Sequence, residues 1–402
     1  MNFLFLADEF YPTFGANSLV VSTVCRQLTT RGHTVWVMPA HYDPALPQEE
    51  VWEGIHIRRG FPADTKQSLI AALRKGHLWC AAGVLTMLVG AKLSGPHRLW
   101  HKQGISARRY LEAFIRQQAI DTVVSIHCSA ELSLPLLHLR QRGRLSARWL
   151  FYMLDPFESH EYYRTHHSVA YLRRMQHRIM TACDGVLATD LIRRDTALWE
   201  TEAVLNKIKV TEFPKIQQPR YCPCDDSILP DPRYTHVVCT GSKNETVRNS
   251  AFTLALCRRM EHLPIHFHFV GHGWTEDGVC HQEGNCFFYP PHSPTCAVNL
   301  QLDGDFLLNI GNNVPNQLPS KILEYISTGK PIIHIAKRED CPATALLTDW
   351  DALILNESEE MSSAQTRLSA YLSAEHPARS FEETEKQFAI YTPAHVVNLF
   401  VN

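Results

Sequence analysis

The sequence lacks the motifs that mark several large classes of nucleotide-binding and hydrolytic enzymes. No GxGxxG follows the first apolar run, which argues against a dinucleotide-dependent oxidoreductase. GxxxxGK followed by Ser or Thr is absent, which excludes a P-loop NTPase. HExxH and GxSxG are absent too, so neither a zincin nor the usual α/β-hydrolase nucleophile elbow is expected.

The sequence also has little net charge and no paired cysteine motif. A net charge of −2 gives no global field for nucleic acid, so no nucleic-acid partner is expected. The 12 cysteines are scattered without a CxxC pair, which favours free thiols in a reducing compartment over a disulfide scaffold. No basic segment precedes an apolar stretch at the N-terminus, so we expect no signal peptide and a cytoplasmic protein.

Length and periodicity predict two α/β domains. A chain of 402 residues is too long for one ordinary core. Short apolar runs alternate with helical-length stretches, as in parallel sheets that are covered on both faces. We therefore predict two Rossmann-like, doubly wound domains facing a central cleft, where such folds bind ligands. The expected strands are Asn2–Asp8, Thr34–Ala40, Ile55–Arg59, Asp121–His127, Arg148–Leu154, Gly185–Thr189, His236–Gly241, Ile265–Gly271, Cys286–Tyr289, Asp305–Ile310, Pro331–Ala336 and Asp351–Asn356.

A proline-rich segment without periodicity separates the two halves. It covers residues 213–233 and is predicted to be a linker. The first domain is then expected over residues 1–212 and the second over 234–385, with a C-terminal helix over 386–402.

The stretch NNVPNQLPSKILEYISTGKPIIHI combines a polar loop, a short helix, a Gly-Lys-Pro stop and a strand. Pro319 suits the first helical position, because its missing N–H would have no partner there. The backbone N–H groups of Ser320, Lys321 and Ile322 would then form a site for a phosphate or diphosphate. Glu324 follows about one turn later, within reach of a sugar hydroxyl pair. The alternative is an ordinary crossover helix with an exposed Lys and Glu.

Four segments follow one another along nearly the whole chain: NFLFLADEFYPTFGANSLVVSTVCRQLTTRGHTVWVMPA, VVCTGSKNETVRNSAFTLAL, GDFLLNIGN and QLPSKILEYISTGKPII. Together they resemble the GT-B glycosyltransferases of the large retaining family 4, which includes bacterial capsule and lipopolysaccharide enzymes. The first segment is similar to the family's first strand, glycine loop, helix and second strand. The second resembles the start of its donor domain, the third the strand before its donor loop, and the fourth its nucleotide-binding segment.

The resemblance implies roles for individual residues of the second half. Glu324 matches the second glutamate of the family's E-x7-E motif, which hydrogen-bonds nucleotide ribose hydroxyls. Ser320 and Lys321 match the positions whose amides hold the distal phosphate. Arg248 matches a cationic residue on the diphosphate. The loops after Gly271 and Tyr289 are expected to recognise the base.

In the first half, the resemblance places Gly15 in the loop that approaches the donor phosphates and His127 beside the donor sugar. Asp155 closes a strand on this side and is a candidate for contact with the acceptor, although an Asp before a proline also commonly starts a turn. In the resembled family the C-terminal helix packs back on the first domain.

Two departures from the family pattern fall in the donor loops. The first glutamate of E-x7-E is replaced by Asn316, which Gln317 and Leu318 follow. The usual arginine after the strand-end glycine is replaced by Ser242, with Lys243 beside it as a point cation. Because amide groups also bond sugar hydroxyls, we infer a changed donor-sugar contact rather than a lost activity.

The resemblance implies a retaining, metal-independent glycosyltransferase that moves a sugar from a nucleotide-diphosphate sugar to a hydroxyl of a glycan or lipid-linked acceptor in cell-surface polysaccharide synthesis. Arg248, Lys243 and the amides after Pro319 would stabilise the departing diphosphate. No cofactor is expected, since the nucleotide sugar is a substrate. Two other functions stay open on this architecture: a non-catalytic subunit that binds nucleotide sugar or scaffolds an assembly, which Asn316 and Ser242 motivate, and a nucleotide-sugar 2-epimerase.

Two histidines alternate with apolar residues on one expected strand. His266 and His268 therefore share a face, where they could form a metal pair. Because no third ligand is evident in the sequence, we expect the rings to pack against a helix and no metal to be bound.

A basic stretch in the first half surrounds an apolar segment. Between Asp64 and Arg109 there are eight Lys or Arg residues and one acidic residue. Leu78–Ala91 is apolar but its 14 residues fall short of the roughly 20 that span a bilayer. We predict peripheral, salt-sensitive binding to anionic lipid at the inner face of the plasma membrane and a polyprenyl-linked acceptor. The alternative is a core helix with a solvated basic rim.

Overall fold

The chain divides into two compact units. Unit 1 comprises Met1–Pro214 and Pro393–Asn402, and unit 2 comprises Lys215–Thr392. The segment that begins unit 2 is bonded within it, since the Ile216 N–H donates to the Tyr391 carbonyl at 3.0 Å. The structure is a computed structural model that describes residues 1–43, 45–60, 97–126, 130–155, 158, 167–222, 231–243, 248–313, 318–377 and 379–401.

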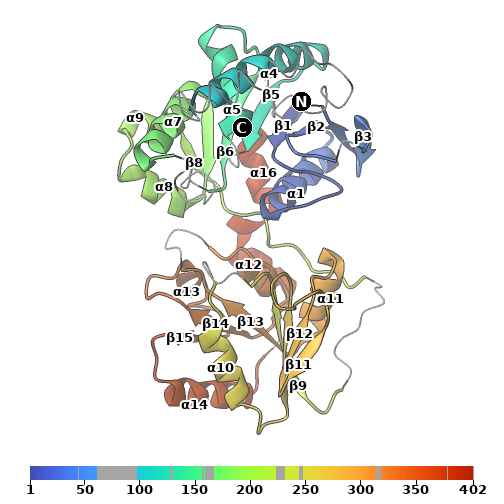
Figure 1. Ribbon diagram of the computed structural model, residues 1–402, viewed down its shortest axis with the longest axis vertical. Helices are drawn as coiled ribbons and strands as arrows, with labels where there is room; N and C mark the ends of the chain where they lie inside the picture. The colour runs from blue at the N-terminus through green and yellow to red at the C-terminus, as the bar shows by residue number, and fades with distance from the viewer. Residues whose placement is uncertain are drawn as a thin grey trace. The chain divides into compact units, whose positions relative to one another are not determined.

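Unit 1 is built on a sheet covered by helices on both faces (Figure 1). Its described strands run in the order β3-β4-β2-β1-β5-β6-β7-β8, all parallel to their neighbours except β3. Alternate side chains of β1 enter opposite cores: Leu4 packs among residues of α4, α5 and α7, and Phe3 among residues of α1 and α16. The bounds are β1 (Asn2–Ala7), α1 (Ala16–Thr30), β2 (Thr34–Pro39), β3 (Glu49–Trp52), β4 (Ile55–Arg58), α4 (His97–Gln117), β5 (Thr122–Ile126), α5 (Ala130–Gln141), β6 (Arg148–Met153), α7 (Val169–Ala182), β7 (Gly185–Ala188), α8 (Asp190–Ala197), α9 (Glu202–Leu205), β8 (Ile208–Val210) and α16 (Pro393–Val401).

Unit 2 repeats this plan with the described strand order β11-β12-β10-β9-β13-β14-β15, in which only β11 runs antiparallel. Val237 and Phe267 point into a core shared with α10 and α14. On the other face, the Gln301 side chain of α11 donates to the Thr240 hydroxyl at 2.8 Å. The bounds are β9 (Thr235–Thr240), α10 (Ala251–Arg259), β10 (Ile265–Val270), β11 (His281–Glu283), β12 (Cys286–Tyr289), α11 (Pro294–Asp303), β13 (Phe306–Ile310), α12 (Lys321–Ser327), β14 (Ile332–Ala336), α13 (Pro342–Leu346), β15 (Ala352–Asn356), α14 (Met361–Leu372), α15 (Phe381–Gln387) and a 3-10 turn (Ala389–Tyr391).

The predicted fold class is confirmed, and each expected strand is present within about two residues of its predicted bounds. The strands that the sequence analysis missed are β3, β8 and β11. All of them lie at the edge of a sheet and are short, and β11 is exposed throughout. An edge strand buries little, so its sequence carries no continuous apolar run.

The predicted membrane-binding segment, Leu78–Ala91, lies outside the described residues. Among the helices that are described, none combines the length and the apolar character needed to cross a membrane.

The helix α16 returns to unit 1 from the far end of the chain. Phe400 is fully buried there, with its ring centroid 5.9 Å from that of Phe5 and 5.3 Å from that of Tyr152. At the helix surface, the Arg31 guanidinium donates to the Asn398 side chain at 2.7 Å. The last turn of the chain is therefore part of the first hydrophobic core.

Replacing Phe400 with alanine is expected to lower the free energy of unfolding of unit 1 by about 3–5 kcal/mol, because a large cavity would remain in a core that relaxes little. Urea denaturation followed by circular dichroism measures this loss. The control is Ile390→Ala: Ile390 is 49% exposed, and its loss should change stability by less than about 0.5 kcal/mol. A Phe400→Ala protein as stable as the control would contradict the packing described for α16.

Candidate functional site

The carboxyl ends of the central strands of unit 2 form the candidate site. The strand order reverses at β9, which lies between β10 and β13, so the loops after these strands diverge. Such a switch point is where open parallel sheets bind ligands. The loop after β9 carries Ser242, Lys243 and Arg248, and the loop after β13 carries Asn312 and leads to α12.

Two glycines let the backbones of the first two loops meet. Gly241 follows β9 and Gly271 follows β10, with φ of 142° and 147°. A Cβ at Gly271 would stand 2.3 Å from the Gly241 carbonyl oxygen. A side chain at Gly271 is therefore excluded by both strain and space, and the floor of the site is bare backbone.

Arg248 is half-buried beside this floor. Its Nε donates to the Asn312 side-chain oxygen at 2.7 Å. Burial lowers the pKa of Arg248, but an arginine keeps its charge at any physiological pH. The fully buried Lys337 ammonium fixes the next residue, because it donates to the Asn249 carbonyl and pairs with Glu357 at 2.7 Å. The guanidinium is thus held in one place with a neutral partner.

Lys243 lies next to Trp274 in the loop after β10. Its ammonium is 5.9 Å from the centroid of the Trp274 ring, which is within the range of a cation–π contact. The Trp274 indole N–H donates to the Gly241 carbonyl at 2.7 Å, and the Lys243 N–H donates to the His272 carbonyl at 2.8 Å. The two loops therefore hold each other as well as the lysine.

The helix expected after the polar loop is α12, which begins at Lys321 with Ser320 as its N-cap. One expectation for its start is wrong. The Ile322 N–H is not open to a ligand, since it donates to the Pro319 carbonyl at 3.0 Å. Because α12 has only seven residues, its dipole alone makes a weak site, and the side chains around it matter more.

Glu324 stands between two lysines. Its carboxylate accepts from Lys215 at 2.9 Å and from Lys321 at 2.6 Å. Burial by itself would raise the pKa of Glu324, but the two ammonium groups outweigh it and hold that pKa at about 2. The carboxylate is therefore ionised and remains an acceptor across the physiological range.

Three of the cations converge on one small cavity. Lys243, Arg248 and Lys321 line it together with Trp274 and Tyr325, and none of the described residues that line it is acidic. A neighbouring cavity of about 550 Å³ shares Lys243 and Trp274 and extends along the loop after β10. Convergent cations without a lining carboxylate form a site suited to an anion.

Of the other predicted residues, Ser242 is exposed and also lines the small cavity. Leu318 is buried before α12 and does not line the cavity. Gly15, the N-cap of α1, and Asp155, which follows β6, belong to unit 1. His127, Asn316 and Gln317 lie outside the described residues.

Several contacts that shape the site were missed in the sequence. Lys215 was assigned to the linker, yet it neutralises Glu324. Tyr325 is buried against the end of β9, where its hydroxyl accepts from the Thr240 N–H at 2.7 Å and donates to the Thr240 carbonyl at 3.1 Å. Lys215 is 109 residues from Glu324, and Thr240 is 85 residues from Tyr325, so no local spacing could reveal these contacts. For Tyr325 the one available signal was an aromatic residue on the apolar face of a short helix.

No protein-family model and no curated protein sequence matches the chain. Solved structures match over the whole chain at low sequence identity. A sucrose-phosphate synthase from Thermosynechococcus elongatus is 12% identical, with a TM-score of 0.63 over 100% of this chain and 97% of its own. A lipopolysaccharide outer core galactosyltransferase is 14% identical, with a TM-score of 0.60 over 100% and 98%. An E. coli structure described as trehalose-6-phosphate bound with UDP-2-fluoro glucose is 12% identical, with a TM-score of 0.60 over 100% and 98%. The chain therefore has the GT-B fold.

Replacing Glu324 with glutamine should remove a specific pH dependence of stability. A folded-state pKa of about 2 means that the ionised carboxylate stabilises unit 2 at neutral pH. This contribution is lost as the pH falls from about 4.3, the ordinary value, through the folded-state pKa. Between about pH 6 and pH 2.5, the wild-type free energy of unfolding should fall by about 2 kcal/mol more than that of Glu324→Gln. The exposed Glu375, replaced in the same way, serves as the control, and wild-type and Glu324→Gln curves that run parallel would rule out the ion-pair assignment.

Proposed function

We propose that the protein is a glycosyltransferase that moves a sugar from a nucleoside-diphosphate sugar to a hydroxyl group. The observation that carries the proposal is the convergence of Lys243, Arg248 and Lys321 on one cavity at the switch point of unit 2. The likeness in fold to a galactosyltransferase, and to a structure described as bound with UDP-2-fluoro glucose, supports the choice of donor.

In the proposed reaction the bond between the sugar and the diphosphate breaks, so negative charge grows on the departing diphosphate. Arg248, Lys243 and Lys321 would stabilise that charge, and they act best because they are positioned beforehand. The acceptor hydroxyl attacks with retention of the anomeric configuration, and a diphosphate oxygen takes its proton. This route requires no protein nucleophile and assigns the work of charge stabilisation to side chains.

The nucleoside is proposed to lie beside the cations. Glu324, held ionised by its two lysines, would accept hydrogen bonds from the ribose hydroxyls. The adjacent cavity of about 550 Å³ is lined by Trp274 and by other residues of the loop after β10, and it is proposed to take the base. Lys321 would then exchange part of its contact with Glu324 for the phosphate.

The test of the function is a panel of UDP- and GDP-sugars with detection of released nucleotide and of changed sugar. Slow release of nucleoside diphosphate from one donor, even without acceptor, is the expected result. Binding across the panel with no release would favour the non-catalytic subunit. Interconversion of free donor sugars would favour the 2-epimerase. A thermal-shift panel identifies the base, since a nucleoside diphosphate at 100 times its Kd should stabilise the protein by about 2.7 kcal/mol.

Replacing Arg248 with alanine should lower donor turnover by about 100- to 1,000-fold, because a fixed cation on the leaving group is removed. Arg248→Lys should recover part of the loss, since it restores the charge without the two-pronged geometry. The matched control is Arg259→Ala in the last turn of α10, where the arginine is exposed. Unchanged turnover in a folded Arg248→Ala protein would contradict the proposed role of Arg248 at the leaving diphosphate.

We also propose a lipid-linked or glycan acceptor reached at an anionic membrane surface, on the basis of the basic stretch Asp64–Arg109. Vesicles containing phosphatidylglycerol should carry the protein upward in a flotation gradient at low salt and release it at high salt, because the attraction is screened. Neutral phosphatidylcholine vesicles are the control. Protein that stays at the bottom with anionic vesicles at low salt would exclude the membrane proposal.

A further inference from the structure

Three histidines gather at the amino end of the unit 2 strands, the opposite edge from Arg248 and Lys243. His236 is the second residue of β9 and pairs in register with His266, the second residue of β10. His268 lies two residues further along β10 and so points to the same face as His266. The sequence analysis found no third ligand for His266 and His268. That expectation is wrong, because the neighbouring strand supplies one.

The ring nitrogens are close enough to share an ion. His236 Nδ1 lies 2.9 Å from His268 Nε2, and one nitrogen from each of the three rings lies within 4.8 Å of the others. In a tetrahedral zinc site with Zn–N bonds of about 2.0–2.1 Å, ligand nitrogens stand about 3.3 Å apart. A site of this kind requires the partly buried His266 ring to turn so that one of its nitrogens reaches this spacing.

The outer nitrogens of two rings are already held as metal ligands usually are. His236 Nε2 is 2.9 Å from the Asp231 carbonyl, which only accepts, so this nitrogen carries the proton and Nδ1 keeps its lone pair. His268 Nδ1 is 3.2 Å from the Tyr289 hydroxyl. Such contacts to a carbonyl or hydroxyl orient an imidazole toward a metal.

Metal binding at these nitrogens requires one proton of His268 to move from Nε2 to Nδ1. Without a metal, His268 Nε2–H donates to His236 Nδ1, and the Tyr289 hydroxyl donates to His268 Nδ1. With a metal, the His268 proton moves to Nδ1 and is donated to the Tyr289 oxygen, which frees Nε2 for the ion. The neutral form of an imidazole is the one that binds metals.

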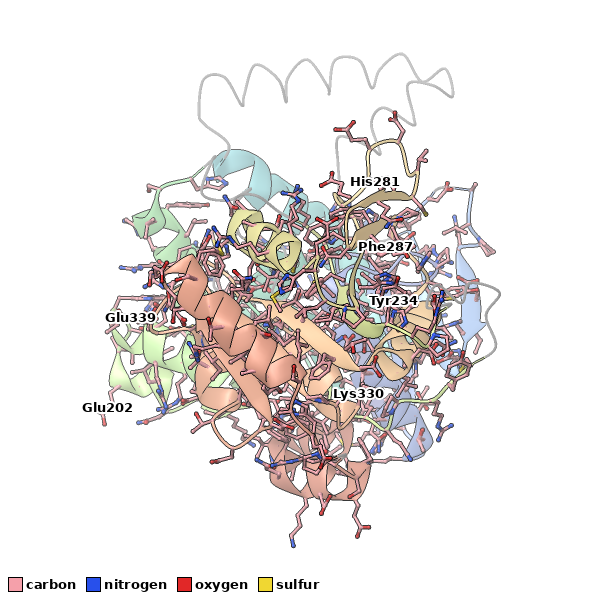
Figure 2. All side chains as sticks on the ribbon, turned by 90° about the horizontal axis from the view of Figure 1, so that it is seen from below. Glu202, Tyr234, His281, Phe287, Lys330 and Glu339 are labelled. Atoms are coloured by element: carbon pink, nitrogen blue, oxygen red, sulfur yellow. The ribbon has the colours of Figure 1, made fainter. Side chains whose placement is uncertain are left out.

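Two of the three histidines, His236 and His268, are buried. The rings of Tyr234 and Phe287, both labelled in Figure 2, pack on His266 with centroids 3.8 and 4.7 Å from its own. The Asp231 carboxylate is paired with Arg233 at 2.6 Å.

We propose that His236, His266 and His268 bind one divalent ion of the zinc class, with water as the fourth ligand. Three imidazoles suit Zn²⁺, Co²⁺ or Ni²⁺ rather than Mg²⁺ or Ca²⁺, which prefer oxygen. The ion joins β9 to β10 on the edge away from the proposed donor site, and its role is to stabilise unit 2.

The test measures Zn²⁺ binding to untagged full-length protein by calorimetry, with melting temperature as a second readout. One ion per chain and a raised melting temperature are expected for the wild type, and His266→Ala should bind at least tenfold more weakly. His262→Ala removes an exposed histidine near the start of the same strand and should bind like the wild type. Arg248→Ala should also retain the ion, which separates this site from the proposed function.

Co²⁺ gives a second, spectroscopic readout of the same site. The wild-type complex should show the visible absorption bands of four-coordinate cobalt, and addition of Zn²⁺ should remove them. If His266→Ala fails to fold, His266→Gln takes its place, because glutamine keeps the size of the side chain. This variant should also lack the bands. Equal Zn²⁺ affinity in the wild type and either His266 variant, or cobalt bands that survive the variant, would overturn the proposal.

Discussion

The charge arrangement at the carboxyl edge of unit 2 depends on how Tyr325 fastens α12 to the end of β9. Its hydroxyl bonds both the N–H and the carbonyl of Thr240, while Gln301 holds the Thr240 side chain. Burial raises the pKa of Tyr325, so the hydroxyl stays protonated and can donate. Because Lys321 and Glu324 lie on this helix, the hydrogen bonds of Tyr325 fix them beside the loop that carries Lys243. Removing a buried partner of this kind commonly costs about 1–3 kcal/mol.

The three cations of the site have different kinds of partner. Arg248 bonds a neutral amide, Lys243 lies near an aromatic face, and Lys321 shares a carboxylate with Lys215. A bound diphosphate would offer Arg248 a charged acceptor in place of its neutral one. The arrangement is therefore compatible with the anion site proposed above.

The sequence was sufficient to predict those strands whose burial requires a recognisable run of apolar residues. Strands such as β1, β5 and β13 are mostly apolar because both of their faces are covered, and they were predicted nearly to the residue. The edge strands β3, β8 and β11 carry no such pattern.

The candidate site was only partly readable for a related reason. Arg248, Lys243 and Lys321 follow strand ends or start a helix, so topology brings them together. Asn312 begins the polar loop that the sequence analysis described, but its hydrogen bond to Arg248 spans 64 residues and has no local signature. The same holds for His236, whose place beside His266 depends on the register of two strands. The roles of His127, Asn316 and Gln317 remain predictions.

The most direct measurement is a crystal structure of the protein with UDP or GDP, whichever binds in the thermal-shift panel. The account predicts diphosphate oxygens within hydrogen-bond distance of Arg248 and Lys243, the ribose hydroxyls on Glu324, and the base in the cavity beside Trp274. A nucleotide bound elsewhere at saturating concentration, with this cluster unoccupied, would contradict it.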